Sequence, residues 1–164
     1  MASEQRMLSL YNYFAWADHM RRLYEASLNS PESLPGRGDP TTWVTMSYWY
    51  SGLYVIVEAW QENLKGLEDK RIDSLLQKQD LVKLLKKYRN ATFHYQPKLF
   101  HSKHIDLMKK GEEARNWIEN VHKAFGDFLE KWFEESGHLA NSRKTERELT
   151  AGKTSEGRNV ETQT

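Results

Sequence analysis

The chain has 164 residues, with 24 Lys or Arg, 23 Asp or Glu and no cysteine. This length predicts one domain that can bury a core unaided, and the lack of thiols excludes disulfide bonds and cysteine-ligated metal sites. Because the net charge is only +1, the molecule as a whole cannot steer a charged partner, and any such preference must come from local charge.

The first half of the chain has apolar residues at three- and four-residue steps, which predicts helices rather than strands. The first helix is expected from about Ser3 to Leu28. Three prolines and two glycines then interrupt the pattern, and the pair Asp39-Pro40 is typical of the start of a second helix, which should reach about Lys65. Since this second helix is apolar on nearly every face, we expect it to be central or shared with another subunit.

The second half predicts two more long helices. After a short helix over Asp69 to Gln77, a third long helix begins near Asp80 and must end before Pro97, because the residue preceding a proline avoids helical geometry. The segment from Pro97 to Gly111 is expected to be a connector with room for one helical turn. The fourth long helix is predicted from Glu112 to Glu135.

These elements predict an all-α fold, an antiparallel four-helix up-and-down bundle with one short extra helix. We assign the bundle to a single domain over residues 1–136. Residues 137–164 are polar and contain only three large aliphatic side chains, which predicts a disordered C-terminal tail.

The longest uncharged stretch, Thr41 to Val57, has seventeen residues. A membrane-spanning helix needs about 20 predominantly apolar residues, whereas this stretch is rich in Thr, Ser and Tyr and runs into Glu58. We therefore expect a helix buried in a water-soluble protein, and no membrane association. The N-terminal residues lack the apolar core of a signal peptide, so the cytoplasm is the expected location.

Positive charge is concentrated between Lys78 and Lys110, which holds nine Lys or Arg and two Asp, a net charge of +7. Such a segment in a nearly neutral chain indicates a polyanionic partner. The alternative is that the lysines form an ordinary solvent-exposed face of a helix and bind no partner.

The same segment contains Arg89, Asn90 and His94. Arginine is always charged and its planar fork fits a phosphate, whereas histidine can accept and donate a proton near neutral pH. Asn90 and His94 are four residues apart and would share a helix face. Arg89 would lie about 140° around an ideal helix from His94, a gap that its long side chain or unwinding before Pro97 must close.

A rival group, Arg115, Asn116 and His122, has a similar order on the fourth long helix. However, Glu112 to Glu135 carries seven acidic and three basic residues. A helix with a net charge of −4 is unfavourable for binding the negatively charged phosphates of RNA. We therefore favour the group on the third long helix.

A metal site is a further alternative, because His101, His104 and Asp106 lie close to His94 in the sequence. Zinc needs three or four protein ligands, usually with a recognisable spacing on a firm helix, and that spacing is missing here. We predict neither a metal nor another cofactor.

The order Arg89-Asn90-Ala91-Thr92-Phe93-His94 resembles the Arg-x4-6-His motif of the HEPN superfamily, in the form found in HEPN toxins that pair with nucleotidyltransferase antitoxins. Its place late in a small helical bundle is also similar. The resemblance implies a homodimer whose two motifs face one cleft, and metal-independent cleavage of RNA through its own 2′-hydroxyl. In those toxins a tyrosine commonly lies two residues after the histidine, whereas here Tyr95 lies one residue after it.

Carried onto this chain, the resemblance makes His94 a general acid or base and Arg89 the group that stabilises charge on the phosphorane. Asn90 would fix the geometry. The resemblance also implies contacts to the RNA backbone from the neighbouring lysines Lys86, Lys87, Lys98 and Lys103.

Two further residues are candidate supporting groups, Glu58 and Tyr95. Glu58 is the first carboxylate after seventeen uncharged residues, and a buried unpaired charge is unfavourable. It either faces the site, as acidic residues on an earlier helix do in some HEPN proteins, or lies half in water near the helix end.

The sequence therefore predicts a HEPN-type endoribonuclease of the toxin–antitoxin or phage-defence kind, with RNA, a second copy and an antitoxin protein as partners. One alternative is a non-catalytic HEPN-like dimeric module that binds RNA, a nucleotide or a partner protein. Another is a helical adaptor whose aromatic second helix docks a protein.

Overall fold

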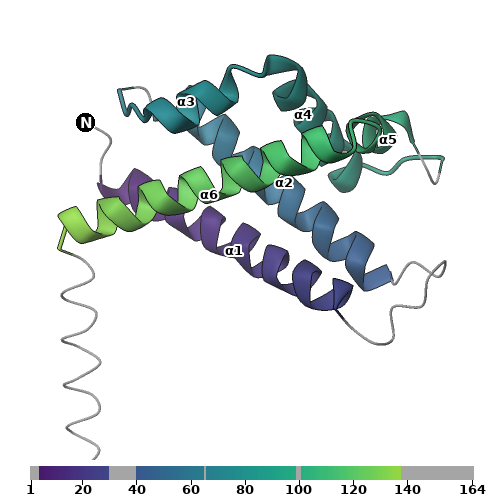
Figure 1. Cartoon of the computed structure of the whole chain (residues 1–164), viewed down its shortest axis with the longest axis horizontal. Helices are drawn as coiled ribbons and strands as arrows, with labels where there is room; N and C mark the ends of the chain where they lie inside the picture. The colour runs from purple at the N-terminus through teal and green to yellow at the C-terminus, as the bar shows by residue number, and fades with distance from the viewer. Residues whose placement is uncertain (1–3, 30–39, 65, 99–100, 138–164) are drawn as a thin grey trace, which may run out of the picture. The chain divides into compact units, whose positions relative to one another are not determined.

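The computed structural model describes residues 4–29, 40–64, 66–98 and 101–137. Within these ranges the chain forms helices and no β-strand (Figure 1). In chain order the helices are α1 (Glu4–Leu28), α2 (Pro40–Glu62), α3 (Lys70–Leu76), α4 (Gln79–Phe93), α5 (Ser102–Met108) and α6 (Glu112–Glu135). The chain divides into two compact units, Met1–Gly126 and Asp127–Thr164, so α6 begins in the first unit and ends in the second.

The predicted fold class, an all-α helical bundle, is confirmed for the described part of the chain. A second short helix, α5, occupies the segment expected to be a connector with one turn. No helix in the described ranges is both long enough and apolar enough to cross a lipid bilayer. The tail predicted over residues 137–164 lies outside the described residues, except for Gly137.

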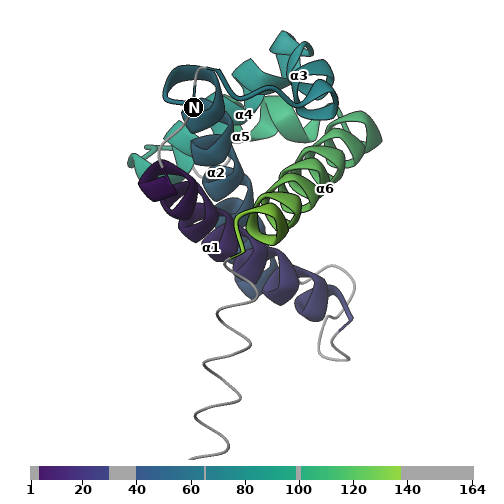
Figure 2. The same cartoon turned by 90° about the vertical axis from the view of Figure 1, so that its left-hand side faces the viewer.

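Helices α1 and α2 lie side by side and run in opposite directions, as Figures 1 and 2 both show. Met7, Leu10 and Ala17 of α1 are buried, as the apolar stripe predicts, whereas Leu28 at the helix end is exposed. The two backbones approach closely at Gly52, where a Cβ atom would stand 3.2 Å from the Cβ of Ala17. The small residues at this point allow the helices to pack without a gap.

Helix α2 is buried along most of its length, which agrees with its apolar composition. Its fully or almost fully buried side chains come from several sides of the helix and include Trp49, Leu53, Ile56 and Val57. An exposed apolar strip remains near its start, formed by Trp43, Val44 and Tyr48.

Helix α4 packs on α2 through its apolar face. Leu81, Leu85 and Tyr88 have no exposed surface, and the Tyr88 hydroxyl forms a buried hydrogen bond of 2.9 Å with Ser47 Oγ. The helix ends at Phe93, earlier than the proline alone requires, and the following residue has an extended backbone. The connection to α3 is short, so α3 and α4 are almost continuous in the sequence.

The part of α6 that belongs to the first unit closes the core. Ile118 and Phe125 have no exposed surface, and the Trp117 indole N–H donates to the Leu75 carbonyl at 2.9 Å. In the second unit, the helix ends before Gly137, whose φ of +73° is the left-handed conformation typical of a helix C-terminus.

Candidate functional site

The predicted catalytic residue Arg89 lies on α4 and contacts α2. Its Nη1 donates to Asn90 Oδ1 at 3.0 Å, and its Nη2 lies 4.0 Å from Glu58 Oε2. The guanidinium carbon lies 6.0 Å from the centroid of the Tyr54 ring, and the Tyr54 hydroxyl donates to Glu58 Oε1 at 3.2 Å. The structure therefore brings Arg89, Asn90 and Glu58 together, with Tyr54 as a fourth member. We call these four residues the Arg89 cluster.

The Arg89 guanidinium is only weakly neutralised in this cluster. The Arg89 and Glu58 side chains are 32% and 28% exposed, and an ion pair of this kind contributes about 0–1 kcal/mol. The Arg89 Nε–H is buried and has no hydrogen-bond partner. Burial, and then the negative charge of Glu58, raise the pKa of Tyr54, so its phenol stays protonated and keeps donating to Glu58. Because about a third of the Arg89 side chain is exposed and its carboxylate partner lies 4.0 Å away, the guanidinium retains capacity to bind an anion.

His94 lies at the C-cap of α4, outside the helix. Its φ of −119° and ψ of 133° are extended, its N–H donates to the Asn90 carbonyl at 3.1 Å, and its ring is exposed. The sequence predicted that unwinding ahead of Pro97 could bring Arg89 and His94 together, and the backbone does leave the helix at this residue. Among the described residues, no hydrogen bond or ion pair joins the His94 ring to the Arg89 cluster.

The residues that flank His94 are apolar and exposed. Phe93 is 54% exposed and its ring contacts that of Tyr48 edge-on, with centroids 5.8 Å apart. Tyr95, a candidate supporting residue, is 92% exposed and so has almost no contact with the protein. The motif therefore ends in an exposed apolar patch on the protein surface.

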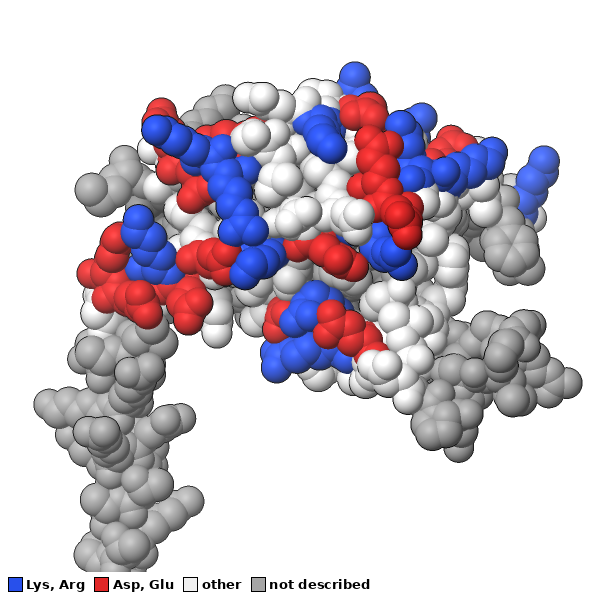
Figure 3. Space-filling model, viewed as in Figure 1, with Lys and Arg blue, Asp and Glu red and all other residues white. Residues whose placement is uncertain are grey.

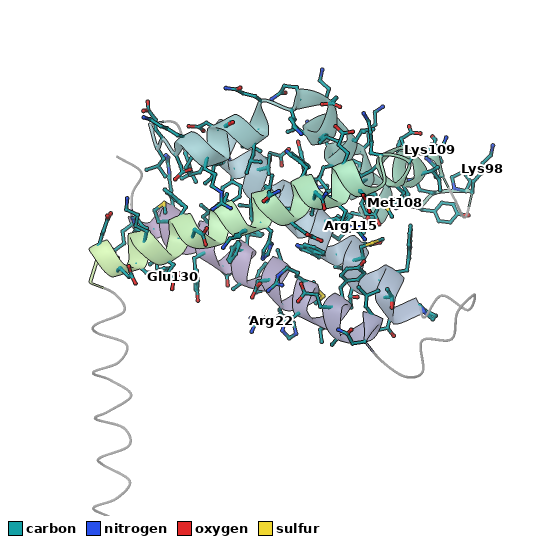
Figure 4. All side chains as sticks on the ribbon, in the orientation of Figure 1. Arg22, Lys98, Met108, Lys109, Arg115 and Glu130 are labelled. Atoms are coloured by element: carbon teal, nitrogen blue, oxygen red, sulfur yellow. The ribbon has the colours of Figure 1, made fainter. Side chains whose placement is uncertain are left out.

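The four candidate RNA-binding lysines are spread over three segments. Lys86 lies next to the Arg89 cluster, with its Nζ 6.0 Å from the centroid of the Tyr54 ring, and Lys87 is exposed on the same helix. Lys103 is half-buried on α5. Lys98 lies in the connection after α4 and points away from the helices (Figure 4).

On the face that Figure 3 shows, acidic side chains interrupt the positive charge of the basic segment. In the view of Figure 3, Lys and Arg side chains over α4 and α5 alternate with acidic ones. Lys110, for example, lies 3.3 Å from Asp80 and 3.7 Å from Glu113. On this face a polyanion would therefore meet interrupted rather than continuous positive charge.

The rival group does not assemble into a site. Arg115 is exposed on α6 (Figure 4) and pairs with Glu112 at 3.5 Å. His122 is only 6% exposed, accepts a hydrogen bond of 3.2 Å from the Trp49 indole at Nδ1, and has its Nε2 3.1 Å from Asp18 Oδ1. Because an indole N–H can only donate, Nδ1 carries no proton and Nε2–H donates to Asp18. Burial lowers the pKa of His122 against the opposing hydrogen bond to Asp18, so this histidine is neutral and structural.

The other histidines near the motif also have structural contacts. His101 Nδ1 accepts the Lys103 N–H at 3.2 Å and so caps the start of α5. His104 packs edge-on against the Trp43 and Tyr88 rings, and burial, followed by the charge of His101, lowers its pKa. In the part of the chain that the structure describes, no group of three or more His, Asp or Glu could hold a metal ion.

The sequence reasoning missed Tyr54 as a member of the site. Its position four residues before Glu58 was a usable signal, because residues with this spacing meet on one helix face. Nothing in the sequence, by contrast, showed that Glu58 would lie within reach of Arg89, since the two belong to different helices.

Comparisons of this chain with protein-family models, with curated proteins and with solved structures give no match.

Proposed function

We propose that the chain is a metal-independent endoribonuclease of the HEPN type that acts as a homodimer in the cytoplasm, in a toxin–antitoxin or phage-defence setting. The observation that carries the proposal is the state of Arg89. Its guanidinium is oriented by Asn90, is only loosely paired with Glu58, and keeps one donor unsatisfied a short distance along the chain from the exposed ring of His94.

The proposed chemistry needs only the groups at this site and the RNA itself. A general base removes the proton of a ribose 2′-hydroxyl, whose oxygen attacks the adjacent phosphorus. The bond to the 5′-oxygen of the next nucleotide breaks, and a general acid protonates that oxygen. The products are a 2′,3′-cyclic phosphate and a 5′-hydroxyl. Arg89 would stabilise the negative charge that builds on the phosphorane, a contribution of the kind that oriented cationic donors make to transition states.

The need for both an acid and a base supports the second copy. One chain supplies one exposed histidine, five residues after Arg89 in the sequence, and a single imidazole cannot hold and lack a proton in the same step. Phe93 and Tyr95 flank His94 with exposed aromatic surface, the kind of surface that is enriched in protein interfaces. A dimer that covers these rings would bring a second His94 to the same phosphodiester.

The alternative is a non-catalytic module in which Arg89 only binds an RNA phosphate, a nucleotide or a partner protein. The contact between Arg89 and Glu58 favours this alternative, because a carboxylate 4.0 Å from the guanidinium weakens its effect on a transition state. The two functions differ in whether His94 is needed for bond cleavage or only for binding.

The test is incubation of the purified protein with single-stranded RNA in EDTA, beside the His94→Ala and Arg89→Ala variants. Arg115→Ala is the matched control, since Arg115 is an exposed, ion-paired arginine of the rival group. We expect the wild type and the control to cleave RNA. The cleavage rate of His94→Ala should be about 10²- to 10⁴-fold lower, while this variant still binds RNA. DNA of the same sequence should remain intact.

Cleavage that survives the loss of His94 would overturn the assignment. RNA binding without cleavage in any variant would favour the non-catalytic module. Light scattering on the same samples reports whether the active species is a dimer, and a monomer that cleaves RNA at full rate would remove the role of the second copy.

A further inference from the structure

An aromatic pocket of about 350 Å³ opens between α1, α2 and the end of α4. Its walls include Tyr13 and Trp16 of α1, Tyr48 of α2 and Phe93 of α4. Gly52 lines it where α1 and α2 meet, and the lack of a side chain there lets the two helices approach closely at Ala17. The volume lies at the lower end of the range for ligand sites, about 300–1,000 Å³, and suits a single ring system.

The lining of this pocket contains a buried hydroxyl group that has no hydrogen-bond partner. Ser51 has no exposed surface, and its Oγ forms no hydrogen bond. A serine in a helix can satisfy its hydroxyl at the carbonyl four residues earlier, and leaving it unsatisfied in a buried position is unfavourable. The hydroxyl therefore offers a donor and an acceptor to a molecule that enters the pocket.

Two partly exposed rings, those of Tyr48 and Phe93, form part of the pocket wall. Tyr48 and Phe93 contact each other edge-on and are each about half exposed. Because Ser51 has no exposed surface, contact between its hydroxyl and a ligand requires side chains of the pocket wall to rotate, and exposed side chains do so within nanoseconds.

The pocket lies next to the Arg89 cluster. Phe93 in its wall immediately precedes His94, and Tyr13 and Val55 line both this pocket and a neighbouring hollow that contains Glu58. Glu58 in turn lies 4.0 Å from Arg89. A molecule held by Arg89 and His94 could therefore extend into the aromatic pocket along one face of α2.

The chemistry of the lining selects an uncharged, planar group with a polar edge. Among the described residues that line the pocket, none is Lys, Arg, Asp or Glu, and His19 is the one side chain that can become cationic, so the lining carries no permanent charge to hold a phosphate. Aromatic side chains stack on the faces of unpaired bases, and hydroxyl groups bond to their edges. In RNA, a base always adjoins the phosphodiester that the neighbouring site would hold.

We propose that this pocket binds one unpaired nucleobase of the RNA substrate, beside the phosphodiester that is cut, an inference that rests on the proposed ribonuclease function. Trp16, which is 58% exposed at the pocket, provides the stacking face, and the Ser51 hydroxyl bonds to the edge of the base. The pocket thereby makes cleavage depend on the identity of one base and on its being unpaired.

The experiment compares wild type, Trp16→Leu and Ser51→Ala on a mixed-sequence single-stranded RNA, with cleavage sites mapped at nucleotide resolution. Tyr11→Leu is the matched control, because Tyr11 is an exposed aromatic residue of the same helix that does not line the pocket. The same variants are titrated with a fully 2′-O-methylated RNA, which cannot be cleaved by this chemistry and so reports binding alone. Light scattering and thermal melting of each variant follow oligomeric state and folding.

We expect the wild type and Tyr11→Leu to prefer one base next to the cut. Trp16→Leu should weaken both cleavage and binding of the methylated RNA by roughly 5- to 100-fold. Ser51→Ala should fold at least as stably as the wild type and should flatten the base preference. A hairpin that holds the preferred base in a pair should be cut more slowly than the single strand.

Different results separate the pocket from the ribonuclease function. RNA cleavage that is unchanged in Trp16→Leu and Ser51→Ala would overturn the base pocket and leave the ribonuclease standing. Binding of methylated RNA that is sensitive to Trp16→Leu, in a protein that cleaves nothing, would support the pocket and overturn the ribonuclease. Conversion of a wild-type dimer to a monomer by Trp16→Leu would show that a second copy fills the pocket, and would overturn the inference.

Discussion

Replacement of His122 by phenylalanine tests the buried histidine that joins α1, α2 and α6. Phenylalanine keeps a ring against Phe14, which stacks on His122 with centroids 4.7 Å apart. It removes the 3.2 Å hydrogen bond from Trp49 and the 3.1 Å contact with Asp18. Any loss of stability therefore reports mainly the hydrogen bonds rather than the volume of the side chain.

The magnitude follows from what each partner retains. The Trp49 indole N–H is left buried without an acceptor, which costs about 1–3 kcal/mol. Asp18 keeps its ion pairs of 2.8 Å with Arg21 and Arg22 and some contact with water. Loss of its hydrogen bond with His122 should therefore cost less stability, about 0.5–1.5 kcal/mol. We expect His122→Phe to lower the free energy of unfolding by about 2–4 kcal/mol, within the total stability of a typical domain.

Urea denaturation at pH 7.5 measures this loss, and a double-mutant cycle with Trp49→Phe isolates the hydrogen bond. The double variant removes both partners of the Trp49–His122 hydrogen bond, so its loss of stability should be about 1–2 kcal/mol smaller than the sum of the two single losses. Nitrogen chemical shifts of the imidazole should also show Nδ1 without a proton. A His122→Phe variant as stable as the wild type, or a cycle with no coupling, would refute the assigned hydrogen bond.

Three further predictions follow from the same core and its surroundings. Burial lowers the pKa of His122 below its ordinary value of 6.5, so the unfolded chain binds the proton first as the pH falls. The free energy of unfolding should therefore decrease below pH 6.5, by up to about 1.4 kcal/mol per pH unit. A pH series of urea midpoints that is equally steep for His122→Phe would contradict this. Tyr88→Phe leaves the buried Ser47 hydroxyl without its 2.9 Å partner and should cost about 1–3 kcal/mol in the same assay, whereas no change would mean that the hydroxyl finds another bond. Gly52→Ala gains about 1 kcal/mol of helix propensity but places a Cβ 3.2 Å from that of Ala17, an overpacking cost of about 1–3 kcal/mol. The substitution should therefore lower the melting temperature. If the two Cβ atoms are in conflict, adding Ala17→Gly to the same chain should restore part of the loss.

The long helices could be predicted because their apolar periodicity and their boundary residues agree. Helix α6 begins at Glu112 and ends at Glu135, the bounds expected from the sequence. The short helix α5 was less predictable. It has only seven residues, too few for a clear period, and its N-cap is the His101 side chain rather than the usual Ser, Thr, Asp or Asn.

The sequence provides the candidate residues Arg89, Asn90, His94 and Glu58, but it provides neither Tyr54 nor the arrangement of the site. Arg89, Asn90 and His94 form a recognisable order in the sequence, but Pro97 predicts only that the helix ends before it and not the break at His94. The distance between Arg89 and Glu58 depends on how α4 packs on α2, which no local pattern specifies. The unpaired hydroxyl of Ser51 was equally hidden, because the sequence shows only that this part of α2 is uncharged.

The close approach of Ala17 and Gly52 has a consequence for how this protein can evolve. Both residues line the aromatic pocket, and they also set how tightly α1 and α2 pack. A larger residue at either position would shrink the pocket and push the helices apart at once. Among homologues, these two positions should therefore vary in concert, with a gain in volume at one accompanied by a reduction at the other, and lineages that keep the pair small should share the same ligand size.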